Sequence, residues 1–515
     1  MNTFQKDFTD YVLSGHSLLH VSTHEKNRVI DHINEISKQI GRTIYMWSVA
    51  MGWRDNQGIS VSEVGLNGPV EEHLAAIAGF GENVICVLQD FGCYLHHETY
   101  SGFDIVISWL NELKQLLSAS CQTIVFVGPT FEYPTELKYD ITAIDFDLPN
   151  RDQIEKQIRF ACEDVTTKNG EKFEPNLDLL PQIIDACRGM TQCQIIDRVA
   201  LVLRKHGDFT KEAIQTLIRE KAAVVNASGL LTYIEPRIKG LSDVGGYEAL
   251  KNHIRLDKPC FAQKARDFGI EFPKGILCVG VSGTGKTLMA TAVAAEFTMP
   301  LITLDVGSLM NSLVGQSEQN LRTAIKMVES MAPCILMIDE IEKSLGGGGE
   351  LDGGSSKRIL GYFLKWMNDR TSPVYVMATA NNVNSLPTEL LRPGRFDVLF
   401  GFDLPCEEER QQIFKIHISK RNRDATAFNL EQLSQVSAGF AGADIEQSVK
   451  LGLKIAFAQS QELKQSHIEL AIEGIVPLSK VEPEKIKNVQ EWCQKHTKMA
   501  NPKAPAQISR RVALK

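Results

Sequence analysis

Runs of five or six mostly apolar residues, several of them followed by a segment with a helical pattern, recur in both halves of the chain. Five of these runs have the length of buried strands, which typically hold about 4 to 8 residues. They are the segments 84–88, 123–128, 275–279, 334–338 and 374–378. Strands that alternate with helices predict an α/β fold.

The two halves follow one plan, with matching segments about 250 residues apart. Four pairs of segments match in the same order, at spacings of 250 or 256 residues: 84–90 with 334–340, 123–128 with 373–378, 147–149 with 403–405, and 189–195 with 439–445. Ordered matches at a nearly constant spacing indicate a duplication. Each half is therefore predicted to be a sheet domain followed by a helical lid.

The predicted boundaries divide the chain into six segments. They are a first α/β domain at 1–145, its helical lid at 146–206, a linker at 207–239, a second α/β domain at 240–402, its helical lid at 403–480, and a C-terminal helix with a basic tail at 481–515. The tail holds Lys503, Arg510, Arg511 and Lys515 and no acid after Glu491. It is interpreted as a disordered end, and a docking segment for a partner is the alternative.

A glycine-rich stretch lies between the strand 275–279 and a helical segment at 288–295. It consists of Gly280, Val281, Ser282, Gly283, Thr284, Gly285, Lys286 and Thr287. Glycines let successive backbone N–H groups point at phosphate oxygens, and the start of a helix adds partial positive charge. We expect Lys286 to reach the terminal phosphates of a nucleoside triphosphate and Thr287 to hold Mg2+ through its hydroxyl. The alternative is a plain glycine turn at a strand end.

Two acids and an amide follow the next strands. The strand 334–338 ends in Asp339 and Glu340, and the strand 374–378 leads to Asn381. Ligands bind at the carboxyl ends of strands in open α/β sheets. We expect Asp339 to orient hydrated Mg2+, Glu340 to activate the attacking water as a general base, and Asn381 to hold that water or the γ-phosphate. The alternatives are a solvated acidic strand end and an ordinary turn asparagine.

The first half lacks these groups. Its loop position, 19–28, contains no glycine, and Gln89 stands opposite Asp339. We interpret this half as a degenerate copy with a structural or partner-binding role; a nucleotide site of unfamiliar form is the alternative. His24 and Glu25 begin like the helix of zinc proteases, but Arg28 stands where the second histidine must be, which disfavours a metalloprotease.

Composition and charge exclude several other classes. With 43% hydrophobic and 23% charged residues among 515, the chain has the composition of a soluble globular protein with room for several domains. The net charge of −8 argues against general nucleic-acid binding. No apolar run approaches the ~18 residues of a membrane helix, so an integral membrane protein is not expected. The N-terminus lacks the features of a secretion signal, and Cys86, Cys278 and Cys334 lie inside predicted strands as reduced core residues.

The segment 390–397, read together with the loop, the acids and Asn381, resembles the AAA ATPases, especially the membrane-protein-extracting and microtubule-severing relatives. Asp243, Val244 and Gly245 resemble that family's adenine-contacting segment, and Ala443 lies in the matching lid segment 439–444. This similarity covers about residues 240 to 460. Over the whole length, the chain is similar to AAA proteins encoded by a conserved open reading frame of cyanobacteria and algal plastids.

The resemblance implies ATP and Mg2+ as cofactors and a homo-oligomeric ring, commonly a hexamer, in which a neighbouring subunit closes each ATP site. Arg392 and Arg395 match the paired arginines that reach across the interface, and a guanidinium fork suits phosphate oxygens. Without the resemblance, surface pairing with acids would be the simpler interpretation. The implied location is the cytoplasm, or the plastid stroma for a plastid-encoded protein.

The chain also departs from the family pattern. Val281 and Ser282 stand where many relatives carry two prolines, and the lid has Ala443 and Asp444 where more distant ATPases present an arginine to the phosphates. Leu313 stands where threading relatives carry an aromatic residue in a central-channel loop, which predicts a weaker grip on polypeptide. A core leucine is the alternative. Glycines at 346–349 and 353–354 predict flexibility at a second channel loop.

Together these features predict an ATP-hydrolysing ring that remodels an unknown protein client, with the first half as scaffold or adaptor. The alternative is a slow, nucleotide-switched regulator or assembly scaffold without threading activity.

Overall fold

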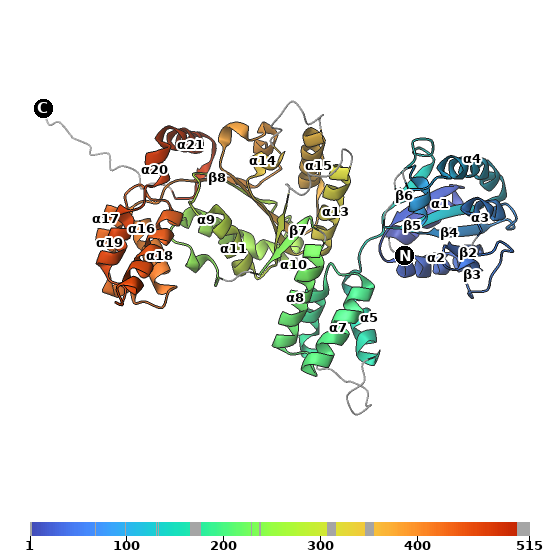
Figure 1. Cartoon of the computed structure of the whole chain (residues 1–515), viewed down its shortest axis with the longest axis horizontal. Coiled ribbons are helices and arrows are strands. Elements are labelled where there is room, and N and C mark those ends of the chain that lie inside the picture. The colour runs from blue at the N-terminus through green and yellow to red at the C-terminus, as the bar shows by residue number, and fades with distance from the viewer. Residues whose placement is uncertain are drawn as a thin grey trace. The chain divides into compact units, whose positions relative to one another are not determined.

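The structure is a computed structural model, and it describes residues 3–66, 68–97, 99–129, 131, 133–164, 177–227, 229–235, 238–305, 316–345 and 355–501. The chain divides into two compact units, residues 1–217 and 218–515 (Figure 1). Each unit is described by itself. Within the described residues, no helix combines the length and apolar character needed to span a membrane.

The first unit begins with a six-stranded sheet. Its strands are β1 (Leu18–Ser22), β2 (Thr43–Ser48), β3 (Gly52–Asp55), β4 (Val84–Gln89), β5 (Thr123–Gly128) and β6 (Ile141–Ile144). They lie in the order β3-β2-β4-β5-β1-β6, and all neighbours are parallel except β2 and β3. The helices around the sheet are α1 (Thr3–Leu13), α2 (Lys26–Ile40), α3 (Val70–Ile77), η1 (Phe91–Leu95) and α4 (Phe103–Ser120).

Alternation along the strands explains why both faces of this sheet are covered. In β4, Cys86 and Leu88 belong to the core that contains residues of α3 and α4. Ile85 and Val87, which point to the other face, belong to the core that contains residues of α1 and α2. A strand that is apolar at every position is therefore buried on both sides, as its sequence predicted.

The rest of the first unit is helical. It contains α5 (Arg151–Asp164), η2 (Leu177–Leu179), α6 (Leu180–Cys187), α7 (Gln192–His206) and the start of α8 (Lys211–Ala227). Helix α5 packs against α6 and α7. Thr191 and Gln194 form a reciprocal capping box that fixes where α7 begins, with the Thr191 N–H donating to Gln194 Oε1 at 2.9 Å.

The second unit is built on a seven-stranded sheet. Its strands are β7 (Leu231–Ile234), β8 (Gly275–Gly280), β9 (Leu301–Leu304), β10 (Cys334–Ile338), β11 (Val374–Ala380), β12 (Val398–Phe402) and β13 (Lys498–Met499). Their order is β13-β12-β8-β11-β10-β9-β7. The two outer strands come from segments predicted as a linker and as a C-terminal helix with its tail: β7 pairs antiparallel with β9, and β13 pairs parallel with β12.

Helices cover both faces of this sheet too. They are η3 (Leu241–Asp243), α9 (Glu248–Asp257), η4 (Lys258–Phe261), α10 (Gln263–Asp267), α11 (Lys286–Phe297), α13 (Gln316–Ser330), α14 (Ile341–Leu345), α15 (Ser355–Asp369), η5 (Val383–Ser385), η6 (Thr388–Leu391), α20 (Leu478–Val481) and α21 (Pro483–His496). One core joins strand residues to α9 and α11, and the other joins them to α13, α15 and α21. Cys278 and Cys334 are fully buried, which confirms them as core residues.

A separate helical bundle, the lid, completes the second unit. It comprises α16 (Glu407–Ser419), η7 (Ala425–Ala427), α17 (Leu430–Val436), α18 (Gly442–Ala458) and α19 (Gln465–Glu473). These helices share one apolar cluster and gather beside α9 and α11 (Figure 1).

The same five-strand order occurs in both units. Reading from one edge, β6-β1-β5-β4-β2 in the first unit corresponds to β12-β8-β11-β10-β9 in the second. The registers add a correction to the predicted spacing: Leu88 pairs with Phe126 and Ile338 with Ala378. When β4 and β10 are aligned at a spacing of 250, β5 and β11 are therefore 252 apart.

Candidate functional site

A cavity of about 410 Å3 lies in the second unit, above the glycine-rich stretch between β8 and α11. Most of the residues singled out from the sequence line it: Asp243, Val244, Gly245, Ser282, Gly283, Thr284, Gly285, Lys286, Thr287, Asp339, Glu340, Asn381 and Ala443. Four do not: Gly280 and Val281 form the base of the loop, and Arg392 and Arg395 lie elsewhere. The fold thus brings together segments that are up to 200 positions apart in the sequence.

Two positions at the base of the loop explain its shape. Gly280 has a φ of 155°, and a Cβ there would lie 2.0 Å from the backbone oxygen of Phe402. Only glycine allows this close approach between β8 and β12. Val281 is buried in the core, and its N–H donates to Phe402 O at 3.1 Å. The valine that departs from the family pattern therefore anchors the loop.

Lys286 is the first residue of α11 and is buried within the loop. Its Nζ donates to the carbonyl oxygens of Gly280 at 2.9 Å and Val281 at 2.7 Å. Burial lowers the pKa of this ammonium to about 8. A phosphate placed in the cavity would favour the charged form, because its negative charge would attract the ammonium and offset the loss of hydration.

Thr287 and Asp339 meet at the carboxyl end of the sheet. The Thr287 hydroxyl lies 3.5 Å from each carboxylate oxygen of Asp339. A hydroxyl and a carboxylate are hard oxygen donors of the kind that Mg2+ prefers, usually together with waters and phosphate oxygens. This pair fits the magnesium site that the sequence predicted.

Glu340 occupies a sharp corner directly after β10. Its φ of 49° is unusual for a residue other than glycine. Asn381 Nδ2 donates to Glu340 Oε1 at 2.9 Å, and Lys343 Nζ lies 2.6 Å from Oε2. The Lys343 hydrogen bond, with a smaller contribution from Asn381, lowers the pKa of the Glu340 carboxyl. Glu340 is therefore an ionised carboxylate near neutral pH.

Glu342, which the sequence did not single out, fixes the backbone at Asn381. It is almost fully buried, and its Oε1 accepts hydrogen bonds from the N–H groups of Asn381 at 2.8 Å and Asn382 at 3.0 Å. The Asn381 side chain is thereby directed at Glu340. The sequence signal for Glu342 was its place as a further acid, two positions after the Asp339–Glu340 pair.

Sequence reasoning also missed the wall of the cavity opposite the acids. Tyr247 donates its hydroxyl to Thr284 O at 2.6 Å, and Ile413, Ile416 and His417 line the cavity from α16. The helical spacing of these three α16 residues was the only signal for them. Burial lowers the pKa of His417 to about 4, so its imidazole is neutral at physiological pH.

The lid touches the loop directly. The Ala443 N–H, at the start of α18, donates to Gly283 O at 3.0 Å. A Cβ on Gly283 would lie 3.4 Å from the Ala443 side chain, so the loop and the lid are in van der Waals contact. The family-like residues of the lid therefore adjoin the loop.

The two arginines lie in the turn between η6 and β12. Arg392 is exposed, and its side chain makes no hydrogen bond or ion pair within the part of the chain that the structure describes; Arg395 Nη1 donates to Asn368 Oδ1 at 3.0 Å. Neither side chain lines the cavity. Leu313, the glycines at 346–349 and 353–354, and the basic tail after residue 501 lie outside the described residues.

The first unit carries a vestige of the same site. Lys26 is the first residue of α2, as Lys286 is of α11, and it forms an ion pair with Asp90. Asp90 has a φ of 54° and occupies the corner after β4, as Glu340 does after β10. The loop between Ser22 and Lys26 is two residues shorter than the loop between Gly280 and Lys286. A lysine and an acid remain, but the phosphate cradle does not.

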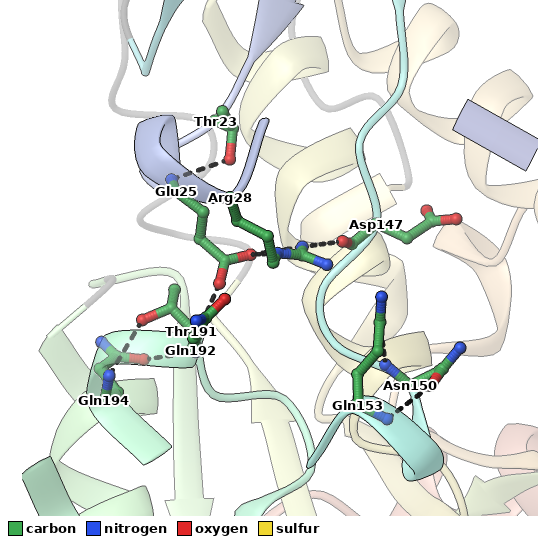
Figure 2. A network of polar contacts seen from close by, with 9 residues as sticks. All are labelled: Thr23, Glu25, Arg28, Asp147, Asn150, Gln153, Thr191, Gln192 and Gln194. Atoms are coloured by element: carbon green, nitrogen blue, oxygen red, sulfur yellow. Dashed lines mark hydrogen bonds and ion pairs between the residues drawn. The ribbon is translucent and has the colours of Figure 1, made fainter. Parts of the chain in front are cut away.

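At the corresponding loop of the first unit, where the second unit has its glycine-rich loop, lies a buried polar network (Figure 2). Glu25 Oε1 accepts a hydrogen bond of 2.6 Å from the Gln192 N–H at the start of α7, and Glu25 Oε2 accepts one of 3.0 Å from Arg28 Nε. Arg28 Nη2 also donates to Asp147 O, in the segment between β6 and α5. We call Glu25, Arg28, Gln192 and Asp147 the first-unit clamp. The Glu25 and Arg28 side chains, with the backbone groups of Gln192 and Asp147 as partners, join the sheet domain to the helices that follow.

Comparison with known proteins identifies the class. Residues 276–404 match the ATPase family associated with various cellular activities, AAA, and residues 4–146 and 152–228 match the N-terminal and second domains of SpoVK-like AAA ATPases. The second unit is thus an AAA ATPase domain with the α/β fold predicted from its loop and strands, and it is preceded by further domains of an AAA protein.

Relatives that match along the whole chain define the family more closely. The chain is 31% identical over 500 residues to the uncharacterized AAA domain-containing protein ycf46 of Pyropia yezoensis, covering 95% of this chain and 97% of that protein. The ycf46 protein of Guillardia theta is 32% identical over 496 residues, with 95% of each chain covered. The chain belongs to this family, which confirms the resemblance noted from its motifs.

A second group matches only part of the chain. The ATP-dependent zinc metalloprotease FtsH of Helicobacter pylori strain J99 is 33% identical over 266 residues, covering 50% of this chain and 42% of that protein. Within the described residues, no group of three or more His, Cys, Asp or Glu side chains is placed to hold a metal ion.

Proposed function

We propose that this chain binds ATP in the cavity above the loop and hydrolyses it. The observation that carries the proposal is the convergence of the glycine loop, Lys286, the Asp339–Glu340 pair and Asn381 on one cavity. In this proposal Asp243, Val244 and Gly245 contact the adenine, and Tyr247 and the α16 residues complete its apolar wall. The loop N–H groups and Lys286 bind the phosphates.

The residues at the carboxyl end of the sheet suit a phosphate-bound Mg2+. Thr287 and Asp339 supply the oxygen ligands, and the bound ion would neutralise charge that develops on the phosphates. Glu340 takes a proton from the attacking water, which requires its carboxylate to be ionised, as its lowered pKa favours. Asn381 holds Glu340 Oε1 through its amide and so fixes the direction of the base.

We propose further that neighbouring copies complete the site in a homo-oligomeric ring. A hollow of about 560 Å3 adjoins the first cavity and shares Glu340 and Asn381 with it. In that hollow, Glu342 Oε2 and Asn381 Oδ1 are buried acceptors without a partner among the described residues. The carboxylates of Glu340 and Glu342 in the lining of the hollow suit a guanidinium, which supports insertion of Arg392 or Arg395 from an adjacent copy.

Exposed aromatic residues support the same arrangement. Phe268, after α10, is 84% exposed, and Phe457, near the end of α18, is 85% exposed. Phe268 belongs to the sheet domain and Phe457 to the lid. If the sheet domain of one copy packs against the lid of the next, the contact joins two different surfaces and is heterologous. Heterologous contacts that close produce rings. A hexamer is the proposed size.

The proposed task of the ring is ATP-driven remodelling of a protein client, a role supported by the similarity to the ATP-dependent FtsH. The second candidate is a slow switch or assembly scaffold. It is favoured by Leu313, which is aliphatic where threading relatives have an aromatic ring. Stimulation of ATPase activity by a client distinguishes the two, since a switch would bind partners in an ATP-dependent way without fast turnover.

The test of the proposal begins with phosphate release by the purified full-length chain, with and without Mg2+. Glu340→Gln should bind ATP and stall, so affinity capture with this variant in the presence of ATP should retain the client. A wild-type chain that releases no phosphate, or a Glu340→Gln chain as fast as wild type, would contradict the proposed activity.

A further inference from the structure

Thr379 lies in β11, the strand beside β10, which ends directly before Asp339 and Glu340. Strands β10 and β11 are parallel neighbours, and Ile338 pairs with Ala378. Asp339 and Thr379 therefore follow at the next position of each strand. Thr379 is 1% exposed, so its hydroxyl is held by protein groups and has little contact with water.

The Thr379 hydroxyl makes two hydrogen bonds of opposite sense. It donates its single proton to Asp339 Oδ1, and it accepts a hydrogen bond from the Glu340 N–H at 3.0 Å. A hydroxyl has one donor and two lone pairs, so both bonds can exist at once. One side chain thus ties the metal-binding acid to the backbone of the proposed general base.

The second bond matters because Glu340 has a left-handed backbone. A residue other than glycine pays a conformational cost at a φ of 49°, and surrounding contacts must hold it there. The first unit solves the same problem differently: Asp90, at a φ of 54°, donates its N–H to the backbone oxygen of Val127 at 2.9 Å.

The register shows what the first unit lacks. Gln89 pairs with Val127 across β4 and β5. Gln89 corresponds to Asp339, and Val127 corresponds to Thr379. The half without a phosphate cradle therefore has neither the metal-binding acid nor the hydroxyl that would hold it, although the sharp corner persists. In each unit the N–H of the corner residue needs an acceptor. For Asp90 the acceptor is the backbone oxygen of Val127, whereas for Glu340 it is the Thr379 hydroxyl, which also binds the Asp339 carboxylate.

We propose that Thr379 is a positioning residue for ATP hydrolysis: its hydroxyl fixes the Asp339 carboxylate toward Thr287 and holds the Glu340 corner. This inference rests on the proposed ATPase function. It predicts that loss of the hydroxyl weakens Mg2+-dependent nucleotide binding and slows turnover, while nucleotide binding without Mg2+ stays intact, because the loop and the adenine wall do not depend on Thr379.

The test compares Thr379→Val with Thr379→Ser in the full-length chain. Binding of a fluorescent ADP analogue is measured in EDTA and in Mg2+, and kcat and KM are measured for ATP. For Thr379→Val we expect unchanged affinity in EDTA, a loss of about 10-fold in the affinity gained from Mg2+, and a fall of about 10- to 100-fold in kcat, the range for groups that orient metal ligands. Thr379→Ser should recover most of both.

The matched control is Thr303→Val in β9, the strand on the other side of β10. The Thr303 hydroxyl is buried and has no hydrogen-bond partner among the described residues, so its removal should change neither readout. Wild-type behaviour of Thr379→Val would overturn the inference, as would a serine variant no better than valine. If the wild type hydrolyses no ATP, the proposed function fails, and the Mg2+-dependent binding still decides the role of Thr379. If Thr379→Val does not fold, Thr379→Ala is measured in its place.

Discussion

The two units share a five-strand order and differ in what lies at the carboxyl ends of the strands. In the second unit a glycine loop leaves a cavity, whereas in the first a shorter loop places Glu25 among protein donors. Both keep a lysine at the start of the following helix and an acid at a left-handed corner. The comparison teaches that the corner and the sheet are features of the shared fold, whereas the glycine loop and Asp339 occur only in the unit that we propose to bind ATP.

The same comparison separates two ways of joining a sheet domain to its lid. In the second unit, a backbone hydrogen bond joins the Ala443 N–H of the lid to the Gly283 carbonyl of the loop, beside the cavity. In the first unit, the charged side chains of the clamp fill this role. We therefore expect the helices that follow the first sheet domain to stay in place without nucleotide. We expect the position of the lid in the second unit to depend on bound nucleotide.

The largest expected effect concerns the arginines, which have no counterpart in the first half, since residues 129–146 contain no arginine. Arg392→Ala and Arg395→Ala should each lower kcat by about 10³-fold if they act on a neighbour's ATP. Mixing either variant with Lys286→Ala should restore part of the activity, because some interfaces then pair an intact site with an intact arginine. Proven mixed oligomers without recovery would rule out action between subunits.

The second prediction contrasts the two corner acids. Glu340→Gln should lower kcat by about 10²-fold or more while ATP still binds, because only the base is lost. The matched variant Asp90→Asn should leave kcat unchanged. An effect of Asp90→Asn as large as that of Glu340→Gln would mean that the first unit takes part in hydrolysis.

The third prediction contrasts the two helix-starting lysines. Calorimetry should find one nucleotide bound per full-length chain. Lys286→Ala should weaken ATP binding by about 10- to 100-fold, the value of a charge-assisted hydrogen bond to phosphate. Lys26→Ala should leave ATP affinity unchanged, since Lys26 pairs with Asp90 inside the protein. Two nucleotides per chain would overturn the view that the first unit has lost its site.

The fourth prediction concerns the first-unit clamp. Glu25→Gln should destabilise the first unit by about 2 kcal/mol, because the buried Arg28 loses its charged acceptor. The control Glu155→Gln breaks an exposed ion pair with Arg159 and should cost less than about 1 kcal/mol. Hydrogen exchange in the full chain gives the readout: amides at the start of α7 should exchange faster in Glu25→Gln, and ATP should not protect them in either chain.

The smallest effect concerns pH. Lys343 lowers the pKa of Glu340, so Lys343→Ala should raise it. Hydrolysis requires the ionised carboxylate, so the acid limb of kcat/KM should move to higher pH in Lys343→Ala and stay in place in Lys343→Arg. An unmoved limb in Lys343→Ala would show that Glu340 does not control it.

Much of the fold was predictable because the strands are short apolar runs with clear ends. The run predicted at 334–338 is the strand β10, and the run predicted at 275–279 is β8 extended by Gly280. The outer strands β7 and β13 escaped because they are short: β7 has four residues, and β13 has only two and owes its place to pairing with β12.

The sequence by itself determined the α/β plan, the glycine loop and the acids, since each depends on residues close together in the chain, and it determined the repeat because short local patterns recur about 250 residues apart. Only the tertiary structure decided how distant groups meet: Thr379 with Asp339, 40 positions apart, and Gln192 with Glu25, 167 apart. Such contacts depend on strand register and on how the lid packs. No local pattern encodes either, because a buried hydrogen bond requires both partners to be placed by the whole fold.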